Sequence, residues 1–118
     1  MQDFRNLEVW RFSHELTLAI YRAIQSFPSD ERFGLISQSR RAACSVECNL
    51  AEGVGRGSDA DFSRFVQMAV GSASEVQCQL LISRDLGYLS DLDYDKFDEQ
   101  IQPIKRMLSS LLKTLRKS

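Results

Sequence analysis

One polar row in this sequence has residue types that could form a specified network of ion pairs and hydrogen bonds. Its members are three or four residues apart and therefore share one side of a helix: Arg41, Ser45, Asn49, Glu52 and Arg56. Guanidinium, amide and carboxylate groups at these positions provide donors and acceptors for a polar contact inside the fold or across a subunit boundary. A solvated helix face is the simpler alternative, because charged rows usually face water.

A second row with the same spacing could supply the partners of the first one. It consists of Ser72, Glu75 and Gln79. If two helices bring the rows together, Glu75 could meet Arg41 or Asn49, and each buried polar atom would need its own hydrogen bond. We predict a structural network, within one subunit or between subunits. Its predicted members are Arg41, Asn49, Glu52 and Glu75.

Catalytic and metal-binding chemistry has little support in the sequence. His14 is the single histidine, and the paired Glu-x-x-His motifs of di-iron bundles are missing. Cys44 and Cys48 lie one helical turn apart and could share a face as zinc ligands, but the other two ligands have no recognisable spacing. Free cysteines also pack well as small hydrophobic residues. We expect no catalytic residue, metal site, cofactor or small-molecule substrate.

Three glycines close together invite a phosphate-loop interpretation. The run Gly53-x-Gly55-x-Gly57 precedes a predicted helix, and Arg56 could assist an anion there. The run follows a helix rather than a strand, however, and lacks the Lys-Ser/Thr ending of a P-loop. Asp59 and Asp61 would occupy the electropositive first turn of the next helix and repel an anion. A tight turn between helices is the favoured interpretation.

Composition is typical of a single folded domain spanning residues 1–118. The chain is 43% hydrophobic and 26% charged, with only 2 prolines and 6 glycines, so few residues would interrupt long helices. No apolar run approaches the roughly 20 residues that span a bilayer, and the first residues do not resemble a signal peptide. The 3 cysteines are an odd number in a chain that needs no disulfides, which favours the reducing cytoplasm.

Charge is distributed unevenly along a chain whose formal net charge is −1. Residues 85–99 hold six acids and one lysine, whereas residues 105–118 hold five cations and no acid. The basic end has three interpretations: a helix end whose cations suit the helix dipole, a phosphate-binding patch, or a contact with an anionic membrane. We expect no membrane partner. The candidate nucleic-acid contacts are Arg40, Arg56, Lys105, Arg106, Lys113, Arg116 and Lys117.

Four amphipathic segments with helical periodicity follow one another. The first covers residues 7–27 and ends before Pro28, after which Ser29 or Asp30 can cap a second helix that stops at the glycine run. Ser58 and Asp61 resemble a capping-box pair at the start of the third helix. The predicted core-facing residues are Val9, Phe12, Leu16, Ile20, Ala23, Phe27, Leu35, Ala42, Val46, Leu50, Phe62, Phe65, Val66, Ala69, Ala73, Val76, Leu80, Tyr94, Phe97, Ile101, Ile104, Leu108, Leu111 and Leu115.

The ends of the last two segments complete the fold prediction. Gly87 is expected to end the third helix in a left-handed conformation, and the fourth begins near Asp91 or Asp93. Pro103 lies inside the fourth segment and should kink it by removing one backbone hydrogen bond. Because no segment alternates with a period of two and the connections are short, the sequence predicts an all-α, antiparallel up-down-up-down four-helix bundle.

A set of short motifs runs through the first three segments. In chain order they are Asn6-Leu7-Glu8-Val9-Trp10, Phe27-Pro28 with Glu31, Phe33-Gly34-Leu35, Gln38 with Arg40-Arg41-Ala42, Asn49 with Ala51-Glu52-Gly53, and Gly71-Ser72-Ala73 with Glu75. From residue 3 to residue 89, this ungapped set resembles the four-helix-bundle proteins of the 23S rRNA-intervening-sequence family. The accessory proteins of diversity-generating retroelements are broader relatives of that family.

The resemblance implies a bacterial protein without catalytic residues, whose closed four-helix bundle tends to assemble as a homopentameric ring. Because the retroelement accessory proteins bind a reverse transcriptase and nucleic acid, it also implies an RNA or a reverse-transcriptase-like protein as partner. The positions carried over as structural or interface residues are Arg41, Asn49, Glu52 and Glu75. Relatives that bind nucleic acid are markedly basic, so the net charge of −1 predicts weaker phosphate affinity here.

These observations lead to two hypotheses about function. The first is a cytoplasmic, non-enzymatic interaction module that binds RNA or a ribonucleoprotein, with a modest basic patch repeated around an assembled ring. The second is a protein-binding scaffold, anchored by an exposed Trp10, Phe12 or Phe33. Convergence of Arg40, Arg56 and the cations of residues 105–117 on one surface would favour RNA, whereas interspersed acids would favour the scaffold.

Overall fold

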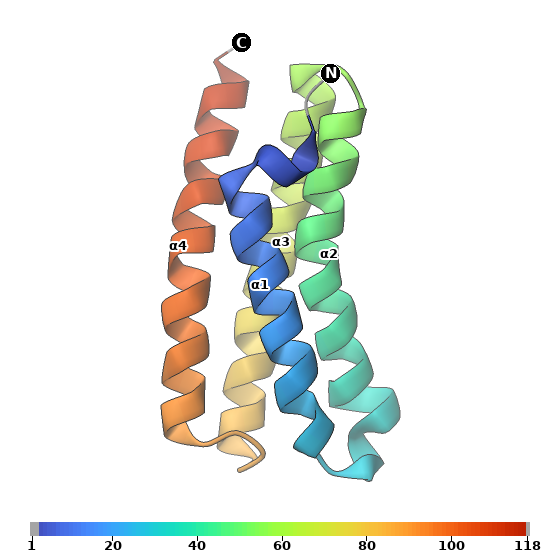
Figure 1. Cartoon of the computed structure of the whole chain (residues 1–118), viewed down its shortest axis with the longest axis vertical. Helices are drawn as coiled ribbons and strands as arrows, with labels where there is room; N and C mark the ends of the chain where they lie inside the picture. The colour runs from blue at the N-terminus through green and yellow to red at the C-terminus, as the bar shows by residue number, and fades with distance from the viewer. Residues whose placement is uncertain (1–2, 118) are drawn as a thin grey trace.

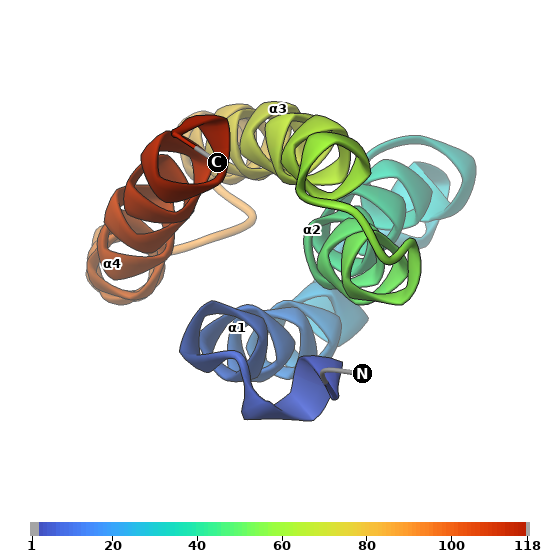
Figure 2. The same cartoon turned by 90° about the horizontal axis from the view of Figure 1, so that it is seen from above.

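The computed structural model describes residues 3–117, which form four long helices and several short helical turns. The long helices are α1 (Glu8–Ala23), α2 (Ser37–Gly55), α3 (Asp59–Asp85) and α4 (Asp91–Arg116). The chain reverses direction at each connection (Figure 1), and the helices follow one another around a central core (Figure 2). Residues 3–117 contain no strand, and the predicted up-down-up-down four-helix bundle is confirmed.

The core is built by the predicted apolar stripes, with a few differences. The predicted positions on α2 and α3 are buried, and Ile101, Ile104 and Leu108 of α4 are at most 1% exposed. Phe12 was predicted to face the core, but 38% of its surface is exposed. It lies beside Pro103 at the seam between α1 and α4, outside the closely packed centre. On α4 the buried position is Leu112, and the neighbouring Leu111 is only half-buried.

The helix ends follow the predicted capping chemistry. The Ser58 hydroxyl accepts a hydrogen bond from the backbone N–H of Asp61 at 3.2 Å, as predicted. Ser90, which was not predicted as a cap, accepts one from the N–H of Asp93 at 3.1 Å. Gly87 follows α3 with a φ of 80°, a conformation that glycine adopts without a steric penalty. The α4 helix runs through Pro103 without a break, although proline cannot donate the backbone hydrogen bond of its position.

The entrance to α2 differs from the prediction of a helix capped by Ser29 or Asp30, because α2 begins at Ser37. A short turn, Ser29–Glu31, leads into a five-residue π-helical turn, Arg32–Ile36, in which Gly34 has non-helical dihedral angles. The Glu31 carboxylate accepts hydrogen bonds from the Leu35 backbone N–H at 3.3 Å and from the Tyr88 hydroxyl at 3.0 Å. A Cβ on Gly34 would lie 3.0 Å from this carboxylate, so the Glu31 side chain would have to shift to accommodate one.

Candidate interaction surface

A pair of serine hydroxyls joins α2 to α3 near the middle of the bundle, and an asparagine amide of α2 supports it. The Ser72 hydroxyl donates to the Ser45 hydroxyl at 2.8 Å. The Asn49 side-chain amide donates to the backbone carbonyl of Ser45 at 2.8 Å and to its hydroxyl at 2.9 Å. Because all three side chains are small and partly buried, they satisfy one another while the two helices stay close. The two polar rows recognised in the sequence therefore lie side by side.

A weak ion pair lies one turn away from these hydroxyls. The Arg41 guanidinium and the Glu75 carboxylate are 4.0 Å apart, with side-chain exposures of 74% and 49%. An ion pair this exposed contributes about 0–1 kcal/mol to folding. Glu75 also accepts a hydrogen bond from the Gln79 side-chain amide at 3.2 Å. Within one chain, the charged part of the row therefore adds little stability.

The other two predicted network residues have local partners. Glu52 pairs with Arg56, one turn later on α2, at 2.7 Å, and Asn49 bonds only to Ser45 among residues 3–117. The structure thus brings Arg41 to Glu75 and Glu52 to Arg56, but the described contacts do not join all four predicted residues into one network inside the chain.

Apolar residues and a glycine flank these polar groups on α3. Met68, Ile82 and Leu86 are 49%, 42% and 54% exposed, and their spacing puts them on the same side of the helix as Glu75. Gly71 lies between Met68 and Glu75, and a Cβ there would meet nothing within 4 Å. We call this surface the α2–α3 face. It comprises Arg41, Ser45, Asn49, Met68, Gly71, Ser72, Glu75 and Ile82.

The α2–α3 face borders one buried polar side chain with an unsatisfied atom. Gln79 is only 6% exposed, and its Oε1 has no hydrogen-bond partner in the described chain. A buried acceptor without a donor costs about 1–3 kcal/mol. The amide nitrogen does have a partner, since it donates to Glu75.

Gln79→Met should therefore raise the free energy of unfolding by about 1 kcal/mol, because it removes the unsatisfied acceptor with little change in side-chain length. Urea unfolding of the purified variant measures this change. Gln38→Met on the exposed part of α2 is the control and should change stability by less than about 0.5 kcal/mol. A loss of stability in Gln79→Met would contradict the prediction.

The seven candidate nucleic-acid contacts do not share one surface. Arg40 lies over the Tyr21 ring at 5.4 Å, and Arg56 pairs with Glu52. Both belong to the α2 side of the bundle, which is opposite α4 (Figure 2). Within one chain, the helix order therefore separates Arg40 and Arg56 from the cations of α4, and the acid Glu52 lies beside Arg56.

Within α4 the cations divide between two sides of the helix. Arg116 donates to the Gln67 side chain of α3, and the partly buried Lys105 lines a cavity between α3 and α4. Arg106, Lys113 and Lys117 are exposed, and their spacing of seven and four residues aligns them on one side. Three of the seven predicted cations thus share one exposed side of α4, which we call the exposed stripe. No helix among residues 3–117 combines the length and the apolar character needed to span a membrane.

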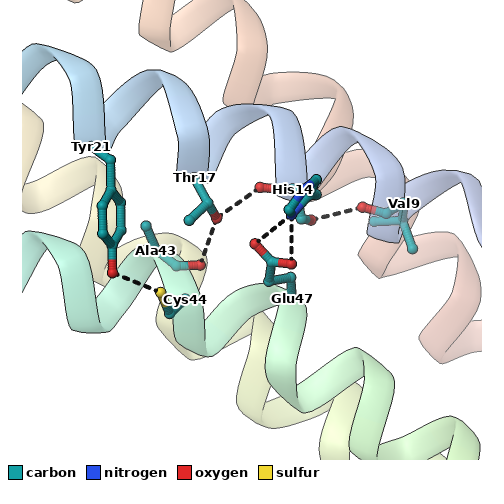
Figure 3. A network of polar contacts seen from close by, with 8 residues as sticks. Val9, His14, Thr17, Tyr21, Ala43, Cys44 and Glu47 are labelled. Atoms are coloured by element: carbon teal, nitrogen blue, oxygen red, sulfur yellow. Dashed lines mark hydrogen bonds and ion pairs between the residues drawn. The ribbon is translucent and has the colours of Figure 1, made fainter. Parts of the chain in front are cut away.

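Polar contacts between α1 and α2 were not predicted from the sequence (Figure 3). His14 Nδ1 lies 2.9 Å from the Glu47 carboxylate, which is 12% exposed. Further along α1, the Thr17 hydroxyl approaches the Ala43 carbonyl at 3.2 Å. The i, i+3 spacing of His14 and Thr17 indicates that both side chains share one side of α1. The spacing alone does not show which helix packs against that side.

The two cysteines of α2 lie in different surroundings, and those of Cys48 favour the neutral thiol. The Tyr21 hydroxyl and the Cys44 sulfur are 3.1 Å apart, and this hydrogen bond, with burial, raises the pKa of Tyr21. Burial is the main cause that raises the pKa of the Cys48 thiol, with the Glu47 carboxylate adding to it. A thiol with a raised pKa is a poor nucleophile and a poor metal ligand at neutral pH. Residues 3–117 contain no group of three His, Cys, Asp or Glu side chains placed to hold a metal ion.

Comparisons with known proteins agree with this fold. Residues 5–110 match the family model described as 23S rRNA-intervening sequence protein. A crystal structure of a protein of unknown function from the S23 ribosomal protein family of Bacteroides thetaiotaomicron is similar, with a TM-score of 0.79 and 23% sequence identity. The similarity covers 89% of this chain and 98% of the other, and at this identity it supports the fold alone. No curated protein matches the sequence.

Proposed function

The chain belongs to the 23S rRNA-intervening sequence protein family, and from this premise we propose that it is a non-enzymatic, self-assembling interaction module. Copies of the chain associate through the α2–α3 face, and the homopentamer implied by the resemblance is the expected assembly. In such an assembly, Arg41 and Glu75 lose water and acquire partners from the neighbouring copy. The exposed Met68 and Ile82, which precede and follow Glu75 along α3, supply apolar contacts with the neighbouring copy.

Gly71 is the observation that carries this proposal. A glycine inside a helix destabilises it by about 0.5–1 kcal/mol relative to alanine. No atom of residues 3–117 lies close enough to Gly71 to exclude a side chain there. Close approach by a second copy explains why a helix-weakening residue stands between two exposed apolar positions. Ser45 and Ser72 beside it are also small, so a neighbouring helix can pack against the backbone there.

Sedimentation equilibrium or native mass spectrometry of the unmodified protein tests the assembly directly. We expect a discrete oligomer at micromolar concentration, with the pentamer as the principal species. A protein that stays at the mass of one chain up to about 100 µM would contradict the proposal, because interfaces of standard size give far tighter association.

RNA binding is a second candidate function, supported by the exposed stripe Arg106, Lys113 and Lys117. Residues 105–118 hold no acid, and the helix dipole accounts for cations only in the last turn of α4. Arg106 lies well before that turn. Repetition of the stripe around an assembly would raise the avidity for a long phosphate backbone.

Fluorescence anisotropy of a labelled, structured rRNA fragment tests this second function. We expect binding that weakens linearly with the logarithm of salt concentration, and a triple change of Arg106, Lys113 and Lys117 to glutamine should reduce the slope by about 2–3. The matched control changes Arg22, Arg32 and Arg84 to glutamine near the opposite end of the bundle and should keep the slope. Absence of saturable binding at low salt would leave protein binding as the function.

A further inference from the structure

A series of surface cavities lies along the contact between α1 and α4. Three cavities of about 360, 210 and 390 Å³ follow one another from the beginning of α1 to its end, each lined by residues of both helices. Leu7 contributes to the first cavity, Phe12 to the second and Ala23 to the third. We call this series of cavities the α1–α4 groove.

Apolar side chains form the floor of the α1–α4 groove. Leu7, Val9, Met107 and Leu111 line one end. Ala19, Ala23 and Phe97 line the other end. Between the two ends, Phe12 meets Pro103, and 38% of the phenylalanine surface is exposed. From residue 7 to residue 23 the floor extends about 24 Å at the helical rise of 1.5 Å per residue.

The middle of the groove carries charges of one sign only. Glu15 and Glu99 line the same cavity as Phe12, both are exposed, and neither forms an ion pair with any residue in 3–117. Because Pro103 has no N–H, the backbone carbonyl of Glu99, four residues earlier, also lacks its usual helical donor. The centre of the groove therefore offers several acceptors and no cation.

The two ends of the groove carry charges of both signs. Glu8 and Arg106 line the first cavity, and Arg22, Asp93 and Lys96 line the third. A ligand complementary to the whole groove is therefore apolar along its length and cationic at its centre. Phosphate backbones do not fit, since Glu15 and Glu99 would repel them.

We propose that the α1–α4 groove binds an amphipathic helix of a partner protein, with a lysine or arginine placed between Glu15 and Glu99. Apolar residues of the partner helix, spaced as i, i+4, i+7 and i+11, contact the apolar floor of the groove. A partner helix of about 16 residues is long enough to span the floor. The proposal rests on the function as an interaction module and identifies the chemistry of the partner. It uses α1 and α4, whereas assembly uses the α2–α3 face.

Two synthetic helical peptides of 18 residues test the proposal. Both carry leucines at the spacing given above, and they differ only in a central lysine or glutamate. In fluorescence anisotropy with the full chain, the lysine peptide should bind at least tenfold more tightly than the glutamate peptide. Changing both Glu15 and Glu99 to lysine should reverse this preference, because the charge at the centre of the groove is then reversed.

Phe12 and Leu18 provide a matched pair of variants on α1. Their exposures are 38% and 40%, but only Phe12 lines the groove. Phe12→Gln should weaken binding of the lysine peptide at least tenfold, and Leu18→Gln should leave it unchanged. Circular dichroism of each variant verifies that the bundle is folded, and variants that unfold are replaced by Phe12→Leu and Leu18→Ala.

Several outcomes would overturn the proposal. These are absence of binding by the lysine peptide at 500 µM, equal binding of both peptides, and equal effects of Phe12→Gln and Leu18→Gln. A change in assembly mass caused by Phe12→Gln alone would instead place a second copy in the groove. The peptide measurement is repeated on Gly71→Gln, a variant designed to block assembly through the α2–α3 face without changing α1 or α4. Failure of assembly and failure of the groove then give different results.

Discussion

Gly71→Gln is expected to convert the assembled protein into single chains that are at least as stable as the original. Glutamine favours a helix by roughly 0.5 kcal/mol over glycine, and the space above Gly71 is open among residues 3–117. In the assembly, the longer side chain would occupy the space needed by the neighbouring copy. Association should weaken by more than tenfold in sedimentation velocity, while thermal unfolding measured at low protein concentration shifts upward.

The control for this experiment is Thr114→Gln on the exposed surface of α4. It introduces the same side chain near the end of another helix and should leave the mass unchanged. Assembly that survives in Gly71→Gln would exclude the α2–α3 face as the contact between copies. Loss of folding in Gly71→Gln would contradict the open space around this position.

Gly53→Leu should lower the free energy of unfolding by about 3 kcal/mol or more, because the side chain would enter a closed contact between α2 and α3. A Cβ at this position would lie 2.8 Å from the Phe62 ring and 2.9 Å from the Phe65 Cβ. The Phe65 Cβ is fixed to the backbone, so a rotamer change cannot relieve the clash. Urea unfolding with linear extrapolation measures the loss.

Gly55→Leu serves as the control, since a Cβ on Gly55 would meet nothing within 4 Å. Its stability should stay within about 0.5 kcal/mol of the original protein. Equal losses in the two variants would mean that glycine is required at both positions for backbone reasons, and the close approach at Gly53 would then not explain the effect.

The bundle could be predicted because its signals are local. Helical spacing of apolar residues, the Ser58 cap and the left-handed Gly87 each depend on a few neighbouring residues, and all three appear in the structure. The irregular entrance to α2 could not be predicted in the same way. It depends on the Glu31 carboxylate, which bonds to Tyr88 from a different part of the chain.

The candidate site was only partly accessible from the sequence for a related reason. Spacing placed Arg41 and Glu75 on facing rows, and the helix pairing brings them to 4.0 Å. Spacing does not tell which side of α1 is covered by α2, so the His14–Glu47 contact and the partly exposed position of Phe12 emerged only with the structure. Pairwise contacts between helices depend on their rotation and register, which periodicity leaves undetermined.

The single tryptophan occupies a position that makes it a built-in optical reporter. Trp10 stacks on His14 with ring centroids 4.9 Å apart, and the Phe4 ring contacts Trp10 edge-on with a centroid distance of 4.8 Å. Since His14 in turn meets Glu47 of α2, the indole senses whether the first turn of the chain, α1 and α2 are docked together. Its emission can therefore follow loosening of this corner without any added label, separately from the far-ultraviolet signal of the whole bundle.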